Sequence, residues 1–476
     1  MRVLIEHVQP QIDGGRFPIK RTPGEPVTVT ADVFADGHDV IAAVVRHRRL
    51  PAGGAAHLHA EEGGLLHADE PGWHETPMAP LGNDAFTATF TPDTVGWFEY
   101  GVAAWVDRFA SWHHDLVAKF DAGQDVTSEL LEGAALVRAA AGRARGRRNV
   151  PADRIGWLDA QADALEAHAP AEERVALAGT PELHRLMEGL ADRGHAAVSR
   201  VLRVWVDRAR ARFGAWYEMF PRSVGSTPTR SGTFAQAESR LPAIAAMGFD
   251  VLYLPPIHPI GSSFRKGRNN RLRAEPGDPG SPWAIGSEAG GHTAVEPGLG
   301  TLDDFDRFRE AAERAGLEVA LDLAYQCSPD HPWVREHPEW FRHRPDGTIK
   351  YAENPPKKYQ DIYPLDFECR DWRALWQALR DVVLFWVGHG VRIFRVDNPH
   401  TKTFGFWEWM IHEVRAAHPD AIFLAEAFTR PKPMRRLAKA GFSQSYTYFT
   451  WRNTAAELQD YFTELTQTEA REYLRP

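Results

Sequence analysis

A short apolar stretch with a charged tip constrains this chain more than any other feature. Val391–Phe394 is followed directly by Arg395, Val396 and Asp397. In a strand, alternate residues share a face, so Arg395 and Asp397 point the same way and Asp397 lies at the C-terminal tip. A (β/α)8 barrel keeps its reacting groups at this end of its strands. The stretch therefore predicts a barrel strand that ends in a functional carboxylate.

A second stretch of the same kind follows 29 positions further on, where Ala421–Ala425 leads to Glu426. That spacing accommodates one strand, one helix and one return. A lone Asp at a strand end more often caps a loop, but two carboxylates in register indicate glycosyl chemistry by a carboxylate pair. Arg395, on the face of Asp397, would hold that carboxylate ionised, as a nucleophile requires.

The composition is ordinary for a globular protein, with 43% hydrophobic and 25% charged residues. The net charge of −9 argues against nucleic acid and anionic membranes as partners, because both require a basic surface. The start of the chain lacks a signal-peptide core, and no apolar run reaches the ~18 residues of a membrane helix. Cys327 and Cys369 are too few for a disulfide framework. These features predict a cytoplasmic protein.

Two shifts in composition predict three domains. Residues 1–112 alternate apolar and polar positions between Gly and Pro breaks, as in Pro26–Phe34, which is typical of an antiparallel β-sandwich. Residues 113–212 are rich in Ala, Leu, Arg and Glu at helical spacing, as in Leu183–Arg203, and predict a helical bundle. Strands and helices alternate over residues 213–476, which predicts a (β/α)8 barrel.

The predicted barrel is incomplete. A long insertion at about 328–370 separates its third and fourth strands, with a hairpin turn expected at Pro345-Asp346-Gly347. Since a barrel needs eight strands, we expect the chain to be truncated on its C-terminal side and residues 1–476 alone to be an inactive fragment. The six expected strands are 215–219, 250–254, 317–324, 391–396, 422–424 and 443–449.

The strand ends resemble the alpha-amylase family of glycoside hydrolases and transferases. The fourth-strand motif of that family, G-x-R-x-D-x-x-x-H, appears here within Gly390–His400. The chain departs from the motif beyond its end, because most amylases carry a Lys-His pair where Asn398–Lys402 stands. The resemblance implies a multidomain protein with an alpha-amylase-type barrel.

Within that family, the chain is similar to the bacterial α-1,4-glucan:maltose-1-phosphate maltosyltransferases over essentially its whole length. The third-strand motif D-x-x-x-N-H reads Asp322–Cys327, so Gln326-Cys327 replaces the Asn-His pair of an ordinary amylase. The other stretches similar to the maltosyltransferases are Pro255–Gly261, Phe264–Gly267, Trp283–Ser287, Gln326–Trp333 and Glu353–Asp361.

The resemblance implies a role for each candidate residue. Asp397 would be the nucleophile and Glu426 the general acid/base. A maltose 1-phosphate donor carries about two negative charges, which local lysines of an acidic protein would offset. The substrate-binding candidates are Lys266, Lys357, Tyr359 and Asn398 for the donor phosphate, Gln326 and Asp361 for maltosyl hydroxyls, and Arg395 beside the nucleophile.

The implied reaction is a double displacement that retains anomeric configuration. The partners are α-maltose 1-phosphate and an α-1,4-glucan acceptor, and neither a metal nor an organic cofactor is needed. The resemblance also implies a homodimer through the sandwich and helical domains. The family's third catalytic carboxylate would lie beyond Pro476.

Two other readings remain open at this point. One is an α-glucan hydrolase or branching-type transferase on the same barrel. The other is a catalytically incomplete glucan-binding fragment, which the missing strands favour. Phosphate release from maltose 1-phosphate distinguishes maltosyl transfer from the hydrolase or branching reading. Any catalytic turnover excludes the glucan-binding fragment.

Overall fold

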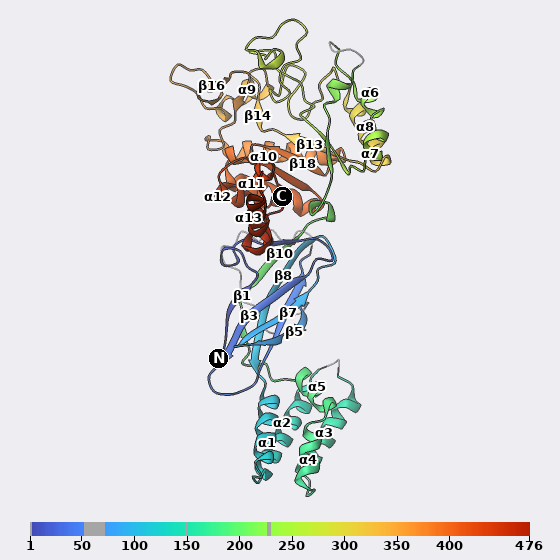
Figure 1. The fold of residues 1–476 in the computed structure, drawn as a ribbon, viewed down its shortest axis with the longest axis vertical. Coiled ribbons are helices and arrows are strands. Elements are labelled where there is room, and N and C mark those ends of the chain that lie inside the picture. The colour runs from blue at the N-terminus through green and yellow to red at the C-terminus, as the bar shows by residue number, and fades with distance from the viewer. Residues whose placement is uncertain (1, 52–71, 148–149, 226–229) are drawn as a thin grey trace.

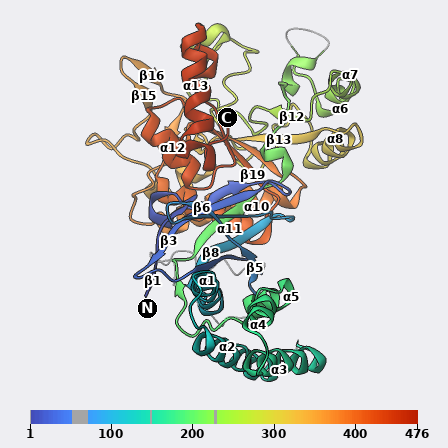
Figure 2. The ribbon, with the colours of Figure 1, turned by 60° about the horizontal axis from the view of Figure 1, so that its bottom comes forward.

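The computed structural model describes residues 2–51, 72–147, 150–225 and 230–476. Three bodies follow one another along the long axis of the molecule (Figure 1). A β-sandwich lies in the middle, five helices lie at one end, and a parallel sheet with its helices lies at the other. The view in Figure 2 likewise places the sandwich between the helices α1–α5 and the parallel sheet.

Two β-sheets form the sandwich. One has the order β1-β3-β7-β6, and the other has the order β2-β10-β8-β4-β5 with β9 beside β8. Val27, Val29 and Val33 alternate with more exposed residues along β3 and are buried between the sheets. The strands are β1 (Val3–Gln9), β2 (Ile19–Arg21), β3 (Val27–Ala35), β4 (Ile41–Arg49), β5 (His74–Pro77), β6 (Ala79–Gly82), β7 (Ala85–Phe90), β8 (Gly96–Val106), β9 (Ala197–Val198) and β10 (Leu202–Val206).

Five helices follow β8 and enclose an apolar core of their own. Leu116, Leu130, Val137 and Leu165 are fully buried in it. The side chain of Asp107 accepts a hydrogen bond from Ala110 N and caps the first helix. The helices are α1 (Arg108–Asp121), α2 (Thr127–Arg145), α3 (Ala152–Glu166), α4 (Ala171–Ala178) and α5 (Pro181–Gly189).

The helical interpretation of Leu183–Arg203 is wrong beyond Gly189. The chain returns there to the sandwich, where β10 pairs with β8 in antiparallel and with β2 in parallel orientation. Leu202, Val204 and Val206 share one face of β10 and are buried in the sandwich core, and β10 lies between β2 and β8. The three-domain division stays a proposal, in which residues 197–206 complete the sandwich.

The parallel sheet contains six strands in the described part of the chain, and they lie side by side in chain order. All six strand positions were predicted, although the last strand is only two residues long. The strands are β11 (Trp216–Glu218), β12 (Val251–Leu254), β13 (Glu318–Leu323), β18 (Ile393–Asp397), β19 (Ile422–Glu426) and β20 (Gln444–Ser445).

Helices pack on the convex face of this sheet. Residues 234–246 form two short helices rather than one, because Pro242 removes a backbone donor where the chain bends. The helices are α6 (Phe234–Glu238), α7 (Leu241–Ala246), α8 (Leu302–Arg314), α10 (Trp372–Gly388), α11 (Phe404–Ala417), α12 (Pro431–Lys439) and α13 (Ala455–Gln467).

A long segment separates β13 from β18, as predicted. The expected turn is present: Arg344 N donates to Thr348 O at 2.7 Å, and Gly347 has a φ of 84°. A second hairpin, formed by β15 and β16, was not predicted. The elements of the segment are β14 (Gln326–Cys327), α9 (Pro332–Glu336), β15 (Ala352–Asn354), β16 (Lys357–Tyr359) and β17 (Tyr363–Pro364).

The sandwich and the barrel-like part share a core. Ala470, Tyr473 and Leu474 pack with the buried residues of the sandwich. The buried Arg21 guanidinium contacts Glu472 at 2.6 Å, across the seam between the two parts. The segment after α13 therefore locks the parallel sheet onto the sandwich. Among the described residues, no helix combines the length and apolar character required to cross a bilayer.

Candidate active site

The carboxylates predicted as a pair lie at the same edge of the sheet. Asp397 and Glu426 end the neighbouring parallel strands β18 and β19, and their Cα atoms are register partners. Strand alternation places Ile393 and Ile422 on the same concave face further down, where they are buried. The two carboxylates therefore lie at adjacent strand tips, above an apolar floor.

Arg395 joins three carboxylates at this edge. Its Nη1 lies 2.8 Å from Asp322 Oδ2 and 3.1 Å from Asp397 Oδ1, and its Nη2 lies 3.1 Å from Glu426 Oε1. The guanidinium is 9% exposed, so water screens these contacts little. The planar guanidinium group of Arg395 thus fixes the relative positions of Asp397 and Glu426, because its several N–H donors can contact both carboxylates at once.

The electrostatics differ among the members of this cluster. Burial raises the pKa of Asp322 to about 7; Arg395 lowers it and the charge of Asp397 raises it. Burial also raises the pKa of Glu426, against the opposing effect of Arg395 and with a contribution from Asp397. A carboxyl group whose pKa is raised retains a proton more readily near neutral pH, which a general acid requires.

The loop after β18 is held against the pair. Asn398 has a φ of 42°, a left-handed conformation that non-glycine residues seldom adopt, and its backbone N donates to Glu426 Oε2 at 3.3 Å. The Lys402 ammonium donates to the carbonyl oxygens of Asp397 at 3.0 Å and of Asn398 at 3.2 Å. This strained backbone at a strand end is typical of functional loops.

Two tyrosines of the site were not predicted. Tyr253, from β12, donates its hydroxyl to Asp322 Oδ2 at 2.5 Å. The guanidinium carbon of Arg395 lies 5.7 Å from the ring centre of Tyr253 and 5.9 Å from that of Tyr446. The sequence carried one signal for Tyr253, because it occupies an inward position of the second predicted strand. Tyr446 follows the short β20 and gave no such signal.

The residues predicted to bind the donor phosphate are spread over three loops. Lys266 is 8% exposed and lies near Asp361, which is 2% exposed. Burial raises the pKa of Asp361 while the charge of Lys266 opposes it. Lys357 and Tyr359 stand on the hairpin strand β16, where Lys357 is exposed and Tyr359 is half-buried. In the part of the chain that the structure describes, no hydrogen bond or ion pair joins Lys357 or Tyr359 to the carboxylate cluster, so their part in the site stays a prediction.

Gln326 is anchored beside the site. Its side-chain Nε2 donates to Trp283 O at 3.2 Å, and its backbone lies in β14, which pairs with β17. The Gln326 amide oxygen is not used in that hydrogen bond and can accept one from a sugar hydroxyl.

A buried group beneath β14 has the composition of a metal site. One ligand atom each of His292, Cys327 and His331 lies within 4.8 Å of the others. However, Trp333 N donates to His331 Nδ1 at 3.0 Å, so the proton of a neutral His331 is on Nε2. That nitrogen lies 3.1 Å from His292 Nδ1 and donates to it, and His292 Nε2 then donates to Ala324 O at 3.0 Å.

This chain of hydrogen bonds leaves no ring lone pair of His292 or His331 for a metal. Burial lowers the pKa of His292 to about 4 and that of His331 to about 2, so both rings are neutral at ordinary pH. We therefore assign the group as a relay that anchors the loop of His331 to the end of β13 at Ala324. It supports the site from below and holds no ion.

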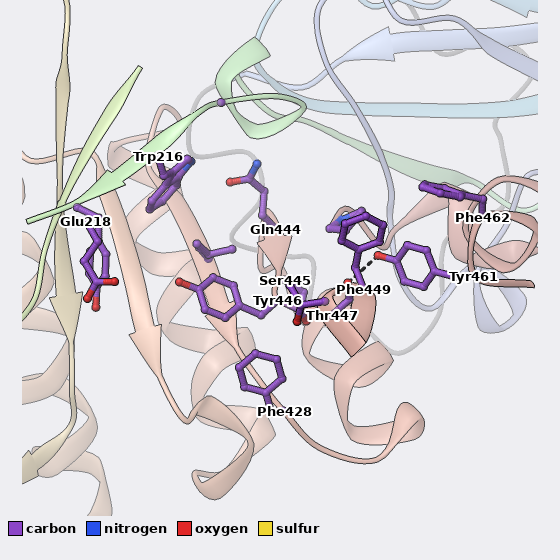
Figure 3. A pocket seen from close by; sticks show the side chains of 15 residues that line it. Trp216, Glu218, Phe428, Gln444, Ser445, Tyr446, Thr447, Phe449, Tyr461 and Phe462 are labelled. Atoms are coloured by element: carbon purple, nitrogen blue, oxygen red, sulfur yellow. Dashed lines mark hydrogen bonds between the residues drawn. The ribbon is translucent and has the colours of Figure 1, made fainter. Parts of the chain in front are cut away.

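A cavity of about 670 Å³ lies between the two edge strands, β11 and β20 (Figure 3). Trp216 and Glu218 line it from β11, and Tyr446 and Phe428 line it from the other side. Phe428 is two positions beyond Glu426 in the sequence, but neither Asp397 nor Glu426 lines this cavity.

Fold and site together define a class. A parallel βα sheet carries Asp397 and Glu426 on adjacent strand tips, in register and joined by Arg395. Enzymes that cleave and form glycosidic bonds by acid–base and nucleophilic catalysis use such a pair of carboxylates.

Comparison with known proteins specifies the class further. The family profile described as "Alpha-1,4-glucan:maltose-1-phosphate maltosyltransferase, domain N/S" matches residues 1–208. Proteins named alpha-1,4-glucan:maltose-1-phosphate maltosyltransferase are similar over the whole chain. The one from Chlorobaculum tepidum is 52% identical, with 100% of this chain and 67% of its own length aligned. The one from Myxococcus xanthus is 51% identical, with 99% and 69% aligned.

The chain therefore belongs to the alpha-1,4-glucan:maltose-1-phosphate maltosyltransferase family. A relative from Cereibacter sphaeroides is 51% identical, and 100% of this chain aligns with 76% of that protein. The chain thus spans about two thirds to three quarters of the length of these three relatives. The solved structure of an alpha-amylase from Lactobacillus plantarum is 29% identical over 54% of this chain and 60% of that one, with a TM-score of 0.45, and adds nothing to the assignment.

Proposed function

We propose that this protein is a retaining glycosyltransferase that moves a maltosyl unit from α-maltose 1-phosphate to the non-reducing 4-hydroxyl end of an α-1,4-glucan and releases phosphate. The observation that carries the proposal is the pair Asp397 and Glu426, which are register partners joined by Arg395. The names of the relatives supply the substrates. They do not favour the hydrolase, branching or binding-fragment readings.

In the first half-reaction, Asp397 attacks the anomeric carbon of the donor and the bond to the phosphate oxygen breaks. Arg395 holds the attacking carboxylate in place through the contact of its Nη1 with Asp397 Oδ1 at 3.1 Å. Glu426, whose pKa burial raises, supplies the proton to the departing phosphate. The product of this step is a β-maltosyl ester on Asp397.

In the second half-reaction, the ionised Glu426 takes the proton from the 4-hydroxyl of the acceptor end. The acceptor oxygen then attacks the anomeric carbon from the face that phosphate left, and the ester to Asp397 breaks. Two inversions give net retention of configuration, which two carboxylates at close range accomplish.

In this reaction scheme, basic and polar side chains bind the donor phosphate. Lys266, Lys357, Tyr359 and Asn398 are assigned to the phosphate, and Gln326 and Asp361 to maltosyl hydroxyls. The burial of Lys266 beside Asp361 supports their share of the assignment, because a buried ammonium and carboxyl group placed together favour polar ligands. The alpha-amylase-type barrel, the cytoplasmic location and the homodimer belong to the same proposal.

The test is phosphate release from α-maltose 1-phosphate, with and without a maltooligosaccharide acceptor. The complete product of the gene and residues 1–476 are assayed side by side. We expect the complete product to release phosphate only in the presence of the acceptor, and the acceptor to grow by two glucose units. Brisk hydrolysis of starch with untouched maltose 1-phosphate would establish the hydrolase reading instead.

A further inference from the structure

A small, strongly basic cavity of about 70 Å³ lies at the seam between the sandwich and the barrel-like part. We refer to it as the seam cavity. Its walls come from β2, β8 and β10 on the sandwich side, and from α11 and the end of α12 on the other. The polar side chains that define it are Arg16, Lys20, Arg203, Trp205, Arg415 and Lys439.

The seam cavity lies far along the strands from the carboxylate pair. Arg415 donates from Nε to Ala421 O and from Nη1 to Gly441 O, and these residues precede β19 and β20. The cavity is therefore at the N-terminal edge of the parallel sheet, whereas Asp397 and Glu426 are at the C-terminal edge. A ligand in the seam cavity is distinct from the donor phosphate.

Basic residues are concentrated around the seam cavity, although the chain as a whole is acidic. Five of the lining residues are Lys or Arg, while the whole chain has a net charge of −9. The acidic lining residue, Glu408, is already paired with Arg436 at 2.6 Å. Arg415 contacts Asp207 Oδ1 at 3.1 Å, and Lys439 contacts Asp13 Oδ2 at 2.9 Å. These pairs engage Glu408, Asp13 and one oxygen of Asp207; the other oxygen, Asp207 Oδ2, has no hydrogen-bond partner among the described residues.

Lys20 is left without a carboxylate of its own. Its side chain is 3% exposed overall, and its Nζ donates to the carbonyl oxygen of Phe442. Burial lowers the pKa of Lys20 well below its usual range, and an anion bound beside it would raise that pKa again. Within the described ranges, no carboxylate oxygen lies within 4.0 Å of that Nζ. The Trp205 indole N–H, on a residue that is 1% exposed, also has no hydrogen-bond partner among the described residues. Buried donors of this kind are costly unless an acceptor satisfies them.

We propose that the seam cavity is a binding site for a small tetrahedral oxoanion, of the phosphate or sulfate type. Such an anion offers several acceptor oxygens to the Lys20 ammonium, the Trp205 indole and the arginines around them. One water needs about 10–15 Å³ of the same kind of volume, so the cavity holds a handful of waters or one such anion, and a sugar phosphate is too large. By contacting groups of both parts, the anion fastens the sandwich to the parallel sheet.

Inorganic phosphate is the probe, and thermal unfolding is the first readout. The melting temperature is measured in sodium phosphate, in sodium sulfate and in sodium chloride of equal ionic strength. Phosphate and sulfate also stabilise folded proteins generally by exclusion from their surface, so the salts are kept at low millimolar concentration and Lys20→Met is measured beside the parent. A ligand that binds only the folded state stabilises it, so we expect both oxoanions to raise the melting temperature of the parent above that in chloride, and to raise that of Lys20→Met less. Equal melting temperatures in all three salts would overturn the proposal.

Matched variants locate the binding. Lys20→Met removes the buried ammonium while retaining apolar volume, and Arg16→Gln removes an exposed charge from the rim. We expect each to weaken phosphate affinity in calorimetric titration, by about tenfold or more for Lys20→Met. Lys432→Met, at an exposed position of α12, is the control and is expected to titrate like the parent.

A further variant separates this site from the catalytic one. Lys266→Met is expected to abolish a donor-site contribution and to leave the seam contribution intact. Loss of all phosphate binding in Lys266→Met, with unchanged binding in Lys20→Met, would place the anion at the carboxylate edge and refute the seam site. Crystals soaked in selenate locate the anion directly, and we expect an anomalous selenium peak in the seam cavity. If selenate fully occupies other sites and the seam cavity shows no peak, the proposal is wrong.

Discussion

At the scale of single residues, the site depends on Arg395. Its guanidinium is almost buried and contacts Asp322, Asp397 and Glu426 at 2.8–3.1 Å. Burial by itself would lower the pKa of Arg395, but the neighbouring carboxylates, with Asp322 first among them, raise it. The cation is therefore permanent, and it holds two reacting carboxylates that would otherwise repel each other.

Arg395→Lys tests this role. A lysine keeps the charge but is a single point that cannot bridge several carboxylates in one plane. We expect kcat/KM for phosphate release to fall by roughly a hundredfold, which is the cost of two charge-assisted hydrogen bonds or less. Since Arg395 lowers the pKa of Glu426, its loss should also move the alkaline limb of the pH–rate profile to higher pH, because the general acid must be protonated for phosphate release. An unchanged profile would show that Arg395 does not act on Glu426.

Asp322 gives a prediction for stability against pH. Burial raises its pKa to about 7 in the folded protein from an ordinary value of 3.8. Between these two pH values the folded state binds more protons than the unfolded state, so this group makes stability fall as pH rises and has no further effect above the folded pKa. Asp322→Asn cannot ionise, and urea unfolding at pH 5 and pH 8 should show a smaller loss of stability for the variant. A larger loss would refute the assigned pKa.

The sequence predicted part of this site and missed part of it. Asp397 and Glu426 were predictable because strand alternation and a 29-residue spacing fix a register without knowledge of the fold. Tyr253 and Tyr446 were not, because a hydroxyl contact with Asp322 or a ring beside Arg395 depends on which strands become neighbours. The relay through His292 was hidden for the same reason, since His292 and His331 lie in separate loops.

At the scale of elements, the turn from α10 into β18 sets the position of the site. Gly390 has a φ of +83°, and a Cβ there would lie 2.8 Å from Arg309 Nε. The conformation is one that only glycine adopts without strain. Because β18 begins three residues later, this turn fixes where β18 starts and therefore how far along the sheet Asp397 lies.

Gly390→Ala should therefore destabilise the protein by about 1–2 kcal/mol. Gly388→Ala is the matched control: Gly388 ends α10 with open space around it, and alanine there should be neutral or stabilising by up to about 1 kcal/mol. Chemical denaturation of the two variants measures the difference. Equal stabilities would show that the left-handed turn is not needed.

Helices and strands were predictable wherever the apolar residues followed one clear pattern along the sequence. The six parallel strands follow from short apolar runs broken by glycine. The stretch 197–206 was misread because its arginines and alanine-rich neighbours suggested a helix, whereas pairing with β8 selected the strand. Tertiary pairing overrides local composition in such short segments.

At the scale of the whole molecule, the sandwich and the parallel sheet are one folding unit. Tyr473 and Leu474 complete the sandwich core from the far end of the chain, and Arg21 pairs with Glu472. Residues more than 400 positions apart thus share one buried environment. The sandwich and the barrel-like part share buried residues, so their cores are not independent.

Leu474→Ala tests this coupling. Removing a buried leucine side chain typically costs about 2–5 kcal/mol. We expect the variant to lower the midpoints of the sandwich and of the sheet together, in one transition, when unfolding is followed by hydrogen exchange at β3 and at β18. Leu131→Ala, at a residue that is 49% exposed on α2, should change neither midpoint. Loss of β3 protection without β18 would contradict the coupling.

The most direct test of the central claim is to trap the covalent intermediate. The complete gene product is treated with a 2-fluoro analogue of the maltosyl donor, digested and analysed by mass spectrometry. The account predicts one added sugar, attached to the Asp397 carboxylate, and no adduct in Asp397→Ala. Glu426→Ala should still form the adduct but should release it slowly, because an acceptor hydroxyl needs a base more than phosphate needs an acid. An adduct on any other residue, or on the Asp397→Ala protein, would contradict the account.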